Sequence, residues 1–154
     1  MIVTRKQIVP TLLRYVRPGV DILVSDAPDE LGPAGSLACA VPRLGEAEKV
    51  IVTPVDAPPA RRETVLALLS RLDADPNLLA VRPTYQGRGG HPVVLRLPAL
   101  ARYLEPNPPP LRDHLKALGP RRADEPVADA TVRIDLDGPA DVVGVLRAMP
   151  RFLS

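Results

Sequence analysis

Short apolar runs alternate along this chain with longer segments whose apolar residues recur at helical spacing. The clearest helix is predicted over residues 60–72, where Val65, Leu68, Leu69 and Leu72 keep that spacing. The expected strands are 2–3, 21–25, a run ending at Asp56, 78–82, 91–97 and 131–136, and the other expected helices are 7–16, 36–44, 98–104, 111–118 and 139–149. This alternation predicts an α/β fold with a mostly parallel sheet covered on both faces by helices.

Length and composition narrow the class of protein. A chain of 154 residues predicts a single domain over residues 1–154. Hydrophobic residues make up 45% of it, but no apolar run approaches the ~20 residues of a membrane helix, and Cys39 is the only cysteine. We therefore expect a soluble, cytoplasmic protein with no membrane partner. A net charge of +2 and 3% aromatic residues argue against a nucleic-acid partner.

Asp56 is the first candidate for a functional side chain. It follows the apolar run 50–55 and precedes Pro58 and Pro59, which places it where open α/β sheets bind ligands, at the carboxyl end of a strand. A solvated turn carboxylate, or a cap for the next helix, explains the same spacing. The functional interpretation is a ligand of Mg²⁺, which prefers carboxylate oxygens. Pro54 cannot donate a ladder hydrogen bond and predicts a distorted strand end.

A glycine-rich stretch, residues 87–92, precedes the strand predicted at 91–97. A plain hairpin explains it, and so does a binding loop in which Gly90 lets the backbone approach a ligand. In the second interpretation Arg88 and His91 offer hydrogen-bond donors to an anion or a sugar.

A second acidic candidate is the segment 135–141, which contains Asp135 and Asp137. Strand alternation places both side chains on one face, where two carboxylates are costly unless a cation lies between them. Asp137 also stands where it could cap a helix beginning at Pro139. Ser36 is expected near the N-cap of the helix 36–44.

In order and spacing, five segments resemble the MobA-like nucleotidyltransferase family, in particular its molybdenum-cofactor cytidylyltransferase group. These segments are residues 30–37 (ELGPAGSL), 53–58 (TPVDAP), 82–93 (from RP to GGHPV), 111–113 (LRD) and 135–141 (DLDGPAD). The resemblance covers residues 2–146, nearly the whole chain.

That resemblance implies a three-layer, Rossmann-like domain that transfers a nucleoside monophosphate from CTP or GTP to a phosphorylated acceptor such as molybdopterin. It implies that Asp56, with Asp135 or Asp137, would hold a catalytic Mg²⁺, with Mn²⁺ as an alternative. Gly35 and Ser36 would lie near the base or ribose. Arg88, Gly90 and His91 would serve the acceptor.

The family begins with a strand, a glycine-rich phosphate loop and a helix, and residues 1–4 match its second strand. The sequence therefore resembles an N-terminally truncated member. Either the protein starts upstream of Met1 or it is a relative that no longer binds a triphosphate, and we expect the first because the acidic site residues are kept. A strand missing from the sheet would also favour a homo-oligomer. Two other functions fit the same pattern: a non-catalytic nucleotide-binding or regulatory module, and a nucleotide-sugar-dependent glycosyltransferase relative.

Overall fold

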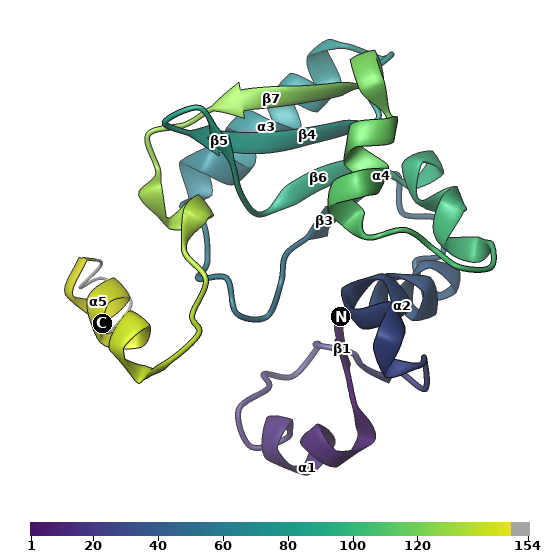
Figure 1. Cartoon of the computed structure of the whole chain (residues 1–154), viewed down its shortest axis with the longest axis vertical. Helices are drawn as coiled ribbons and strands as arrows, with labels where there is room; N and C mark the ends of the chain where they lie inside the picture. Colours follow the sequence, from purple (N-terminus) through teal and green to yellow (C-terminus); the bar gives the residue numbers. More distant parts are fainter. Residues whose placement is uncertain (149–154) are drawn as a thin grey trace. The chain divides into compact units, whose positions relative to one another are not determined.

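The computed structural model describes residues 1–148, which form two compact units. The first unit contains residues 1–48 and 97–117, and the second contains residues 49–96 and the chain from residue 118 onward. Figure 1 shows the helices and strands of both units. No helix within residues 1–148 is long and apolar enough to cross a lipid bilayer.

The first unit holds a parallel pair of short strands, β1 (Ile2–Thr4) and β2 (Ile22–Val24), with Val3 opposite Leu23. The stretch predicted as one helix over 7–16 is instead a 3-10 turn followed by a single helical turn. The other elements of this unit are η1 (Lys6–Ile8), α1 (Val9–Leu12), η2 (Asp29–Leu31), α2 (Gly32–Ala40), η3 (Val41–Arg43), η4 (Leu97–Leu104) and α4 (Leu111–Ala117).

Helices supply most of the interior of the first unit. Leu100 and Tyr103 of η4 are buried, and the Tyr103 ring meets the His114 ring edge to face with centroids 5.4 Å apart. His114 Nε2 lies 2.6 Å from the carbonyl oxygen of Ala99, so the buried imidazole has a hydrogen-bond partner. These contacts fix α4 against η4.

The second unit is built on one sheet with the strand order β3-β6-β4-β5, in which β7 also pairs with β4. Its strands are β3 (Lys49–Val52), β4 (Ala80–Tyr85), β5 (Arg88–Gly89), β6 (Val93–Arg96) and β7 (Arg122–Pro126). The pairs β3–β6, β4–β6 and β4–β5 are antiparallel, and only β4–β7 is parallel.

The α/β class is thus confirmed, but the prediction of a mostly parallel sheet is not. The physical reason is the connection after β4. Gln86 and Gly87 have φ values of +50° and +73°, the signature of a two-residue type I′ turn, which returns the chain antiparallel to β4. A parallel neighbour would have needed a crossover helix at that point.

One helix, α3 (Arg62–Ala74), packs against the sheet to form the core of the second unit. Leu68 and Leu72 pack with Leu78, Val81 and Val94, and all five are buried. Burying an aliphatic side chain of this size stabilises a fold by roughly 1.5–3 kcal/mol. The helical spacing at 60–72 therefore identified the core face correctly.

Two errors of prediction concern the end of the second unit. The strand expected at 131–136 is instead a 3-10 helix, η6 (Ala130–Arg133), followed by an irregular segment. The strand that joins the sheet there is β7, which comes earlier and was not predicted. After η5 (Gly119–Arg121) and these elements, α5 (Pro139–Ala148) begins at the expected proline; Met149 lies outside the described residues.

Candidate functional site

Asp56 lies in an exposed turn rather than at the end of a buried strand. β3 ends at Val52, four residues earlier, and its side chains are only partly buried, with Ile51 47% exposed. Pro54 has no N–H for the ladder, which agrees with the distorted strand end predicted there. The carboxylate nevertheless follows the last ladder residues closely and faces solvent.

The segment that follows η6 is bound to the same turn. The backbone N–H of Leu136 donates to the carbonyl oxygen of Asp56 at 2.8 Å. Asp135 and Asp137 flank Leu136 and are both exposed, but they belong to an irregular segment, so strand alternation does not place them on one face. One hydrogen bond thus joins two of the acidic stretches singled out in the sequence.

The predicted capping role of Asp137 is not what the structure contains. Instead, Oδ2 of Asp141 accepts a hydrogen bond from the N–H of Gly138 at 2.9 Å, so the cap at the start of α5 comes from within the helix. Asp56 does not cap α3 either. The first turn of that helix is capped by Asp129, as described below.

The glycine-rich stretch 87–92 contacts η6 through the backbone of His91, and Gly90 precedes this contact. Gly90 N–H donates to the carbonyl oxygen of Pro83 at 2.9 Å, and His91 N–H donates to that of Val132 at 2.8 Å. A Cβ atom added to Gly90 would overlap the Val132 carbonyl. The glycine is therefore required by a close approach between two backbone segments, not by a positive φ.

His91 has both acidic stretches in its electrostatic surroundings. Burial lowers the pKa of His91 from 6.5, the charges of Asp135 and Asp56 raise it, Arg82 lowers it, and the net pKa lies below 6.5. The imidazole is therefore mostly neutral at pH 7. Its Nδ1 atom is buried and has no hydrogen-bond partner among residues 1–148, which is uncommon for a buried polar atom.

The buried carboxylate of Asp129 organises this region and was not identified from the sequence. Its Oδ2 accepts hydrogen bonds from Arg61 N–H and Thr64 Oγ1, both at 2.8 Å, and its Oδ1 accepts from Thr131 Oγ1 at 2.6 Å and Thr131 N–H at 3.2 Å. Burial alone would raise the pKa of Asp129, but these hydrogen bonds outweigh it and leave the pKa below 3.8.

Asp129 therefore caps α3 and fixes the start of η6 at once. Its only local signal in the sequence is the Asp-x-Thr spacing with Thr131, which is typical of a side-chain turn. Because Val132 directly follows Thr131, this carboxylate also helps to position the Val132 carbonyl, which accepts the hydrogen bond from His91 N–H.

Gly35 and Ser36 lie in α2 of the first unit, and the other candidates lie in the second. Ser36 is not near an N-cap, because α2 begins at Gly32 with Pro33 in its first turn. A Cβ on Gly35 would come within 2.8 Å of the Ala27 Cβ, so tight packing explains this glycine. Their predicted role in nucleotide binding stays a prediction.

The donors present suit a hard cation that keeps part of its water shell. Within residues 1–148 no group of three or more His, Cys, Asp or Glu side chains lies close enough to form a metal site of protein ligands alone. Asp56 and Asp135 are exposed carboxylates that both act on His91. Mg²⁺ is usually held by one or two carboxylates together with water and substrate phosphates, and these two residues fit that pattern.

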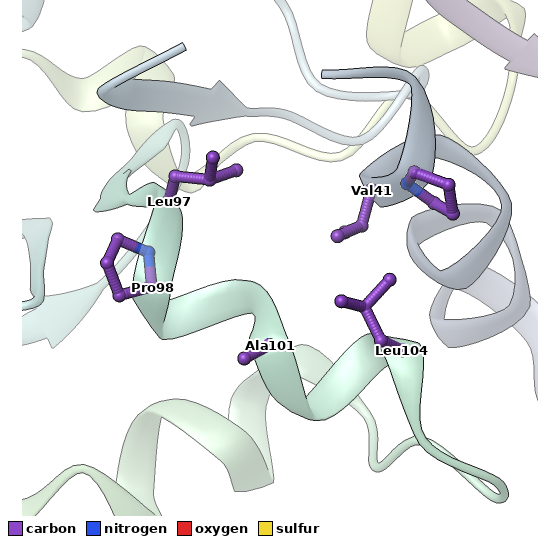
Figure 2. A pocket seen from close by; sticks show the side chains of 6 residues that line it. Val41, Leu97, Pro98, Ala101 and Leu104 are labelled. Carbon is purple, nitrogen blue, oxygen red and sulfur yellow. The ribbon is translucent and has the colours of Figure 1, made fainter. Parts of the chain in front are cut away.

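A separate groove in the first unit is apolar throughout. Figure 2 shows the side chains of η3 and η4 that surround it. Its volume is about 280 Å³. It is lined by Val41, Pro42, Leu97, Pro98, Ala101 and Leu104. These side chains carry no group that could hold a metal or transfer a proton, so the groove offers no chemistry of its own.

Comparison with known proteins identifies the family and the fold of this chain. No protein of curated function matches the sequence. A solved structure of the homologue of Mycobacterium tuberculosis Rv0371c from Mycobacterium sp. strain JC1 is similar at a TM-score of 0.72, with 23% identity over 94% of this chain and 72% of that one. This likeness establishes a shared fold. The family model of the MobA-like NTP transferase domain matches residues 1–125, and the chain belongs to that family.

Proposed function

We propose that this protein is a Mg²⁺-dependent nucleotidyltransferase. It would transfer a nucleoside monophosphate from CTP or GTP to a phosphorylated small-molecule acceptor such as molybdopterin and release pyrophosphate. Membership of the MobA-like NTP transferase domain family supports the reaction class. The nucleotide and the acceptor come from the resemblance of the five sequence segments.

One observation carries the proposal. The hydrogen bonds Leu136 N–H to Asp56 O and His91 N–H to Val132 O tie together three stretches that are far apart in the sequence. They bring two exposed carboxylates, Asp56 and Asp135, into the surroundings of a half-buried imidazole whose Nδ1 lacks a partner. Perturbed titratable groups gathered in this way are typical of functional sites.

The acidic residues would hold the cation in this scheme. Asp56 would be the principal ligand and Asp135 or Asp137 the second, and triphosphate oxygens and water would complete the coordination. When bound, Mg²⁺ neutralises charge on the phosphoryl oxygens and favours in-line attack by the acceptor oxygen. The side chains themselves contribute position and charge.

His91 would face the acceptor. A neutral imidazole has one ring nitrogen that donates and one that accepts, so His91 could exchange a hydrogen bond with an acceptor oxygen. Gly90 keeps the backbone close enough to Val132 to hold His91 in this position.

The test compares Asp56→Asn with Asp21→Asn, which removes an exposed carboxylate just before β2. Nucleotide transfer to the acceptor is measured with CTP and with GTP in the presence of Mg²⁺. We expect Asp56→Asn to lower turnover by at least about 100-fold, since charge neutralisation at a metal site is worth several kcal/mol. Asp21→Asn should keep normal turnover.

Near-normal turnover of Asp56→Asn would remove Asp56 from the metal site. Mg²⁺-dependent nucleotide binding without transfer to any phosphorylated acceptor would overturn the enzyme proposal in favour of a binding module. Hydrolysis of a nucleotide sugar in place of a triphosphate would contradict it in favour of a sugar-transferring relative.

A further inference from the structure

A polar hollow of about 510 Å³ opens between the β4–β5 hairpin and η6 in the second unit. It is lined by Tyr85, Gln86, Arg88, Ala130 and Arg133. The first three come from the hairpin and the last two from η6, and Figure 1 shows these two segments near one another. The hydrogen bond from His91 N–H to Val132 O holds the two walls together.

The charge of the hollow is entirely positive. Arg88 and Arg133 are exposed, and among residues 1–148 neither lies within 4.0 Å of a carboxylate oxygen. Neighbouring arginines of the same sheet are paired: Arg82 forms a bidentate contact with Asp124, at 3.1 and 2.8 Å. Two guanidinium groups that share a hollow repel each other unless an anion is bound between them.

The chemistry of the lining selects the class of anion. Guanidinium groups donate in a planar fork that matches phosphate oxygens, and the phenol of Tyr85 and the amide of Gln86 can add further hydrogen bonds. A phosphate monoester with two negative charges matches two arginines.

The hollow is also connected to the candidate site by the backbone of residues 132–135. Arg133 directly follows Val132, which holds His91, and stands two residues before Asp135. An anion bound by Arg133 would therefore belong to a molecule that reaches toward His91, on the side where the acceptor is placed in the proposed function.

We propose that Arg88 and Arg133 form a subsite for the phosphate of the acceptor. This inference rests on the proposed function for the identity of the acceptor, and it adds the residue Arg133 and the chemistry of the group recognised. Arg133 is a binding residue of this subsite and takes no part in the cation site.

The experiment titrates the full chain with inorganic phosphate and follows the arginine Nε–Hε signals by NMR, without nucleotide or metal. The signals of Arg88 and Arg133 should shift saturably. Arg133→Gln and Arg88→Gln should each weaken phosphate binding at least tenfold. Arg133→Lys, which keeps the charge but loses the planar fork, should give an intermediate loss.

Arg71→Gln is the matched control, because Arg71 is an exposed arginine of α3 that lies outside the hollow. The substitution removes the same charge as Arg133→Gln. It should leave phosphate affinity within twofold of the wild type. Equal weakening by Arg71→Gln and Arg133→Gln, or shifts that do not saturate, would overturn the subsite. The unfolding midpoint of each variant is measured as well. A midpoint equal to that of the wild type shows that weaker phosphate binding does not result from unfolding.

A second titration, in the presence of saturating CTP and Mg²⁺, separates the acceptor's phosphate from the phosphates of the nucleotide. Unchanged affinity for inorganic phosphate supports an acceptor subsite, whereas competition would assign the hollow to the nucleotide and overturn the inference. If CTP binds and phosphate does not, the subsite fails alone. If neither CTP nor GTP binds, the proposed function fails, while the first titration still reports on the hollow.

Discussion

The imidazole of His91 reports directly on its two acidic neighbours. Removing the charge of Asp135 should lower the pKa of His91 further, and Asp56→Asn should lower it by a smaller amount, since Asp135 exerts the larger of the two effects. The pKa is measured from the ring proton signals by NMR. His114 is the only other histidine and provides an internal reference.

Asp21→Asn is the control for a general loss of negative charge and should leave the pKa of His91 where it is. An unchanged pKa in Asp135→Asn would mean that the segment after η6 does not lie beside His91. Shifts of equal size in all three variants would point to net charge rather than proximity.

Gly90 is predicted to tolerate no side chain. Gly90→Ala should lower the free energy of unfolding by about 3 kcal/mol, because its Cβ would overlap the Val132 carbonyl and the two backbone segments would have to separate. Denaturation in urea measures the loss. Gly138→Ala is a suitable control, since its nearest neighbour would be Asp141 Oδ2 at 3.9 Å, and it should be nearly neutral.

Single residues were the most predictable part of the site. A carboxylate after an apolar run, a glycine beside a histidine and a pair of aspartates could be selected from their types and positions. The structure brings Asp56, His91 and Asp135 together. Arg133 could not have been selected, because an exposed arginine in a predicted strand has no local feature that distinguishes it from the other arginines.

Among the helices and strands, α3 and η6 depend on one buried carboxylate. Asp129→Asn should destabilise the protein by about 2 kcal/mol. The Asp129 carboxylate only accepts hydrogen bonds, and each of its two oxygens accepts one from a backbone N–H. In Asp129→Asn the side-chain NH₂ would replace one of these oxygens and would face a backbone N–H that cannot rotate away. Chemical denaturation measures the change.

Asp124→Asn provides the comparison. Asp124 is an exposed residue of β7 that pairs with Arg82, and exposed ion pairs contribute about 0–1 kcal/mol. Its loss should therefore be smaller than that of Asp129→Asn. The reverse order would show that the hydrogen bonds of Asp129 do not hold α3 and η6 together.

Helix α3, whose apolar residues keep a regular helical period, was predicted well, whereas the helix expected over 7–16 was not, and β7 was missed for a physical reason. Its sequence, Arg-Ala-Asp-Glu-Pro, has no apolar alternation, and its position depends on pairing with β4 and on the Arg82–Asp124 contact. Residues 131–136 have the apolar character of a strand, but the hydrogen bonds from Thr131 to Asp129 hold the start of this segment in a 3-10 turn instead. Both outcomes depend on partners distant in the sequence, which local propensity does not reveal.

For the molecule as a whole, acidification should reduce stability in two separate ranges. The pKa of His91 is below 6.5 in the folded protein, so the unfolded chain takes up the proton first and stability falls as the pH drops below about 6.5. The pKa of Asp129 is below 3.8, so the stability it contributes is present above that pH and is lost as the pH falls further.

Urea unfolding between pH 8 and pH 3 measures both changes. His91→Gln should remove the loss that begins near pH 6.5 and leave the acidic one in place. A stability that rises as the pH falls through 6.5 would contradict the lowered pKa of His91 and the buried setting that causes it.

The most direct test of the cation site is a Mg²⁺ titration of the full chain followed through the ring signals of His91. Mg²⁺ held by Asp56 and Asp135 adds positive charge beside the imidazole, so the pKa of His91 should fall saturably, and Asp56→Asn should abolish the response while Asp21→Asn retains it. A pKa of His91 that does not change on addition of Mg²⁺, with and without CTP, would contradict a cation site at these residues and the transferase activity that depends on it.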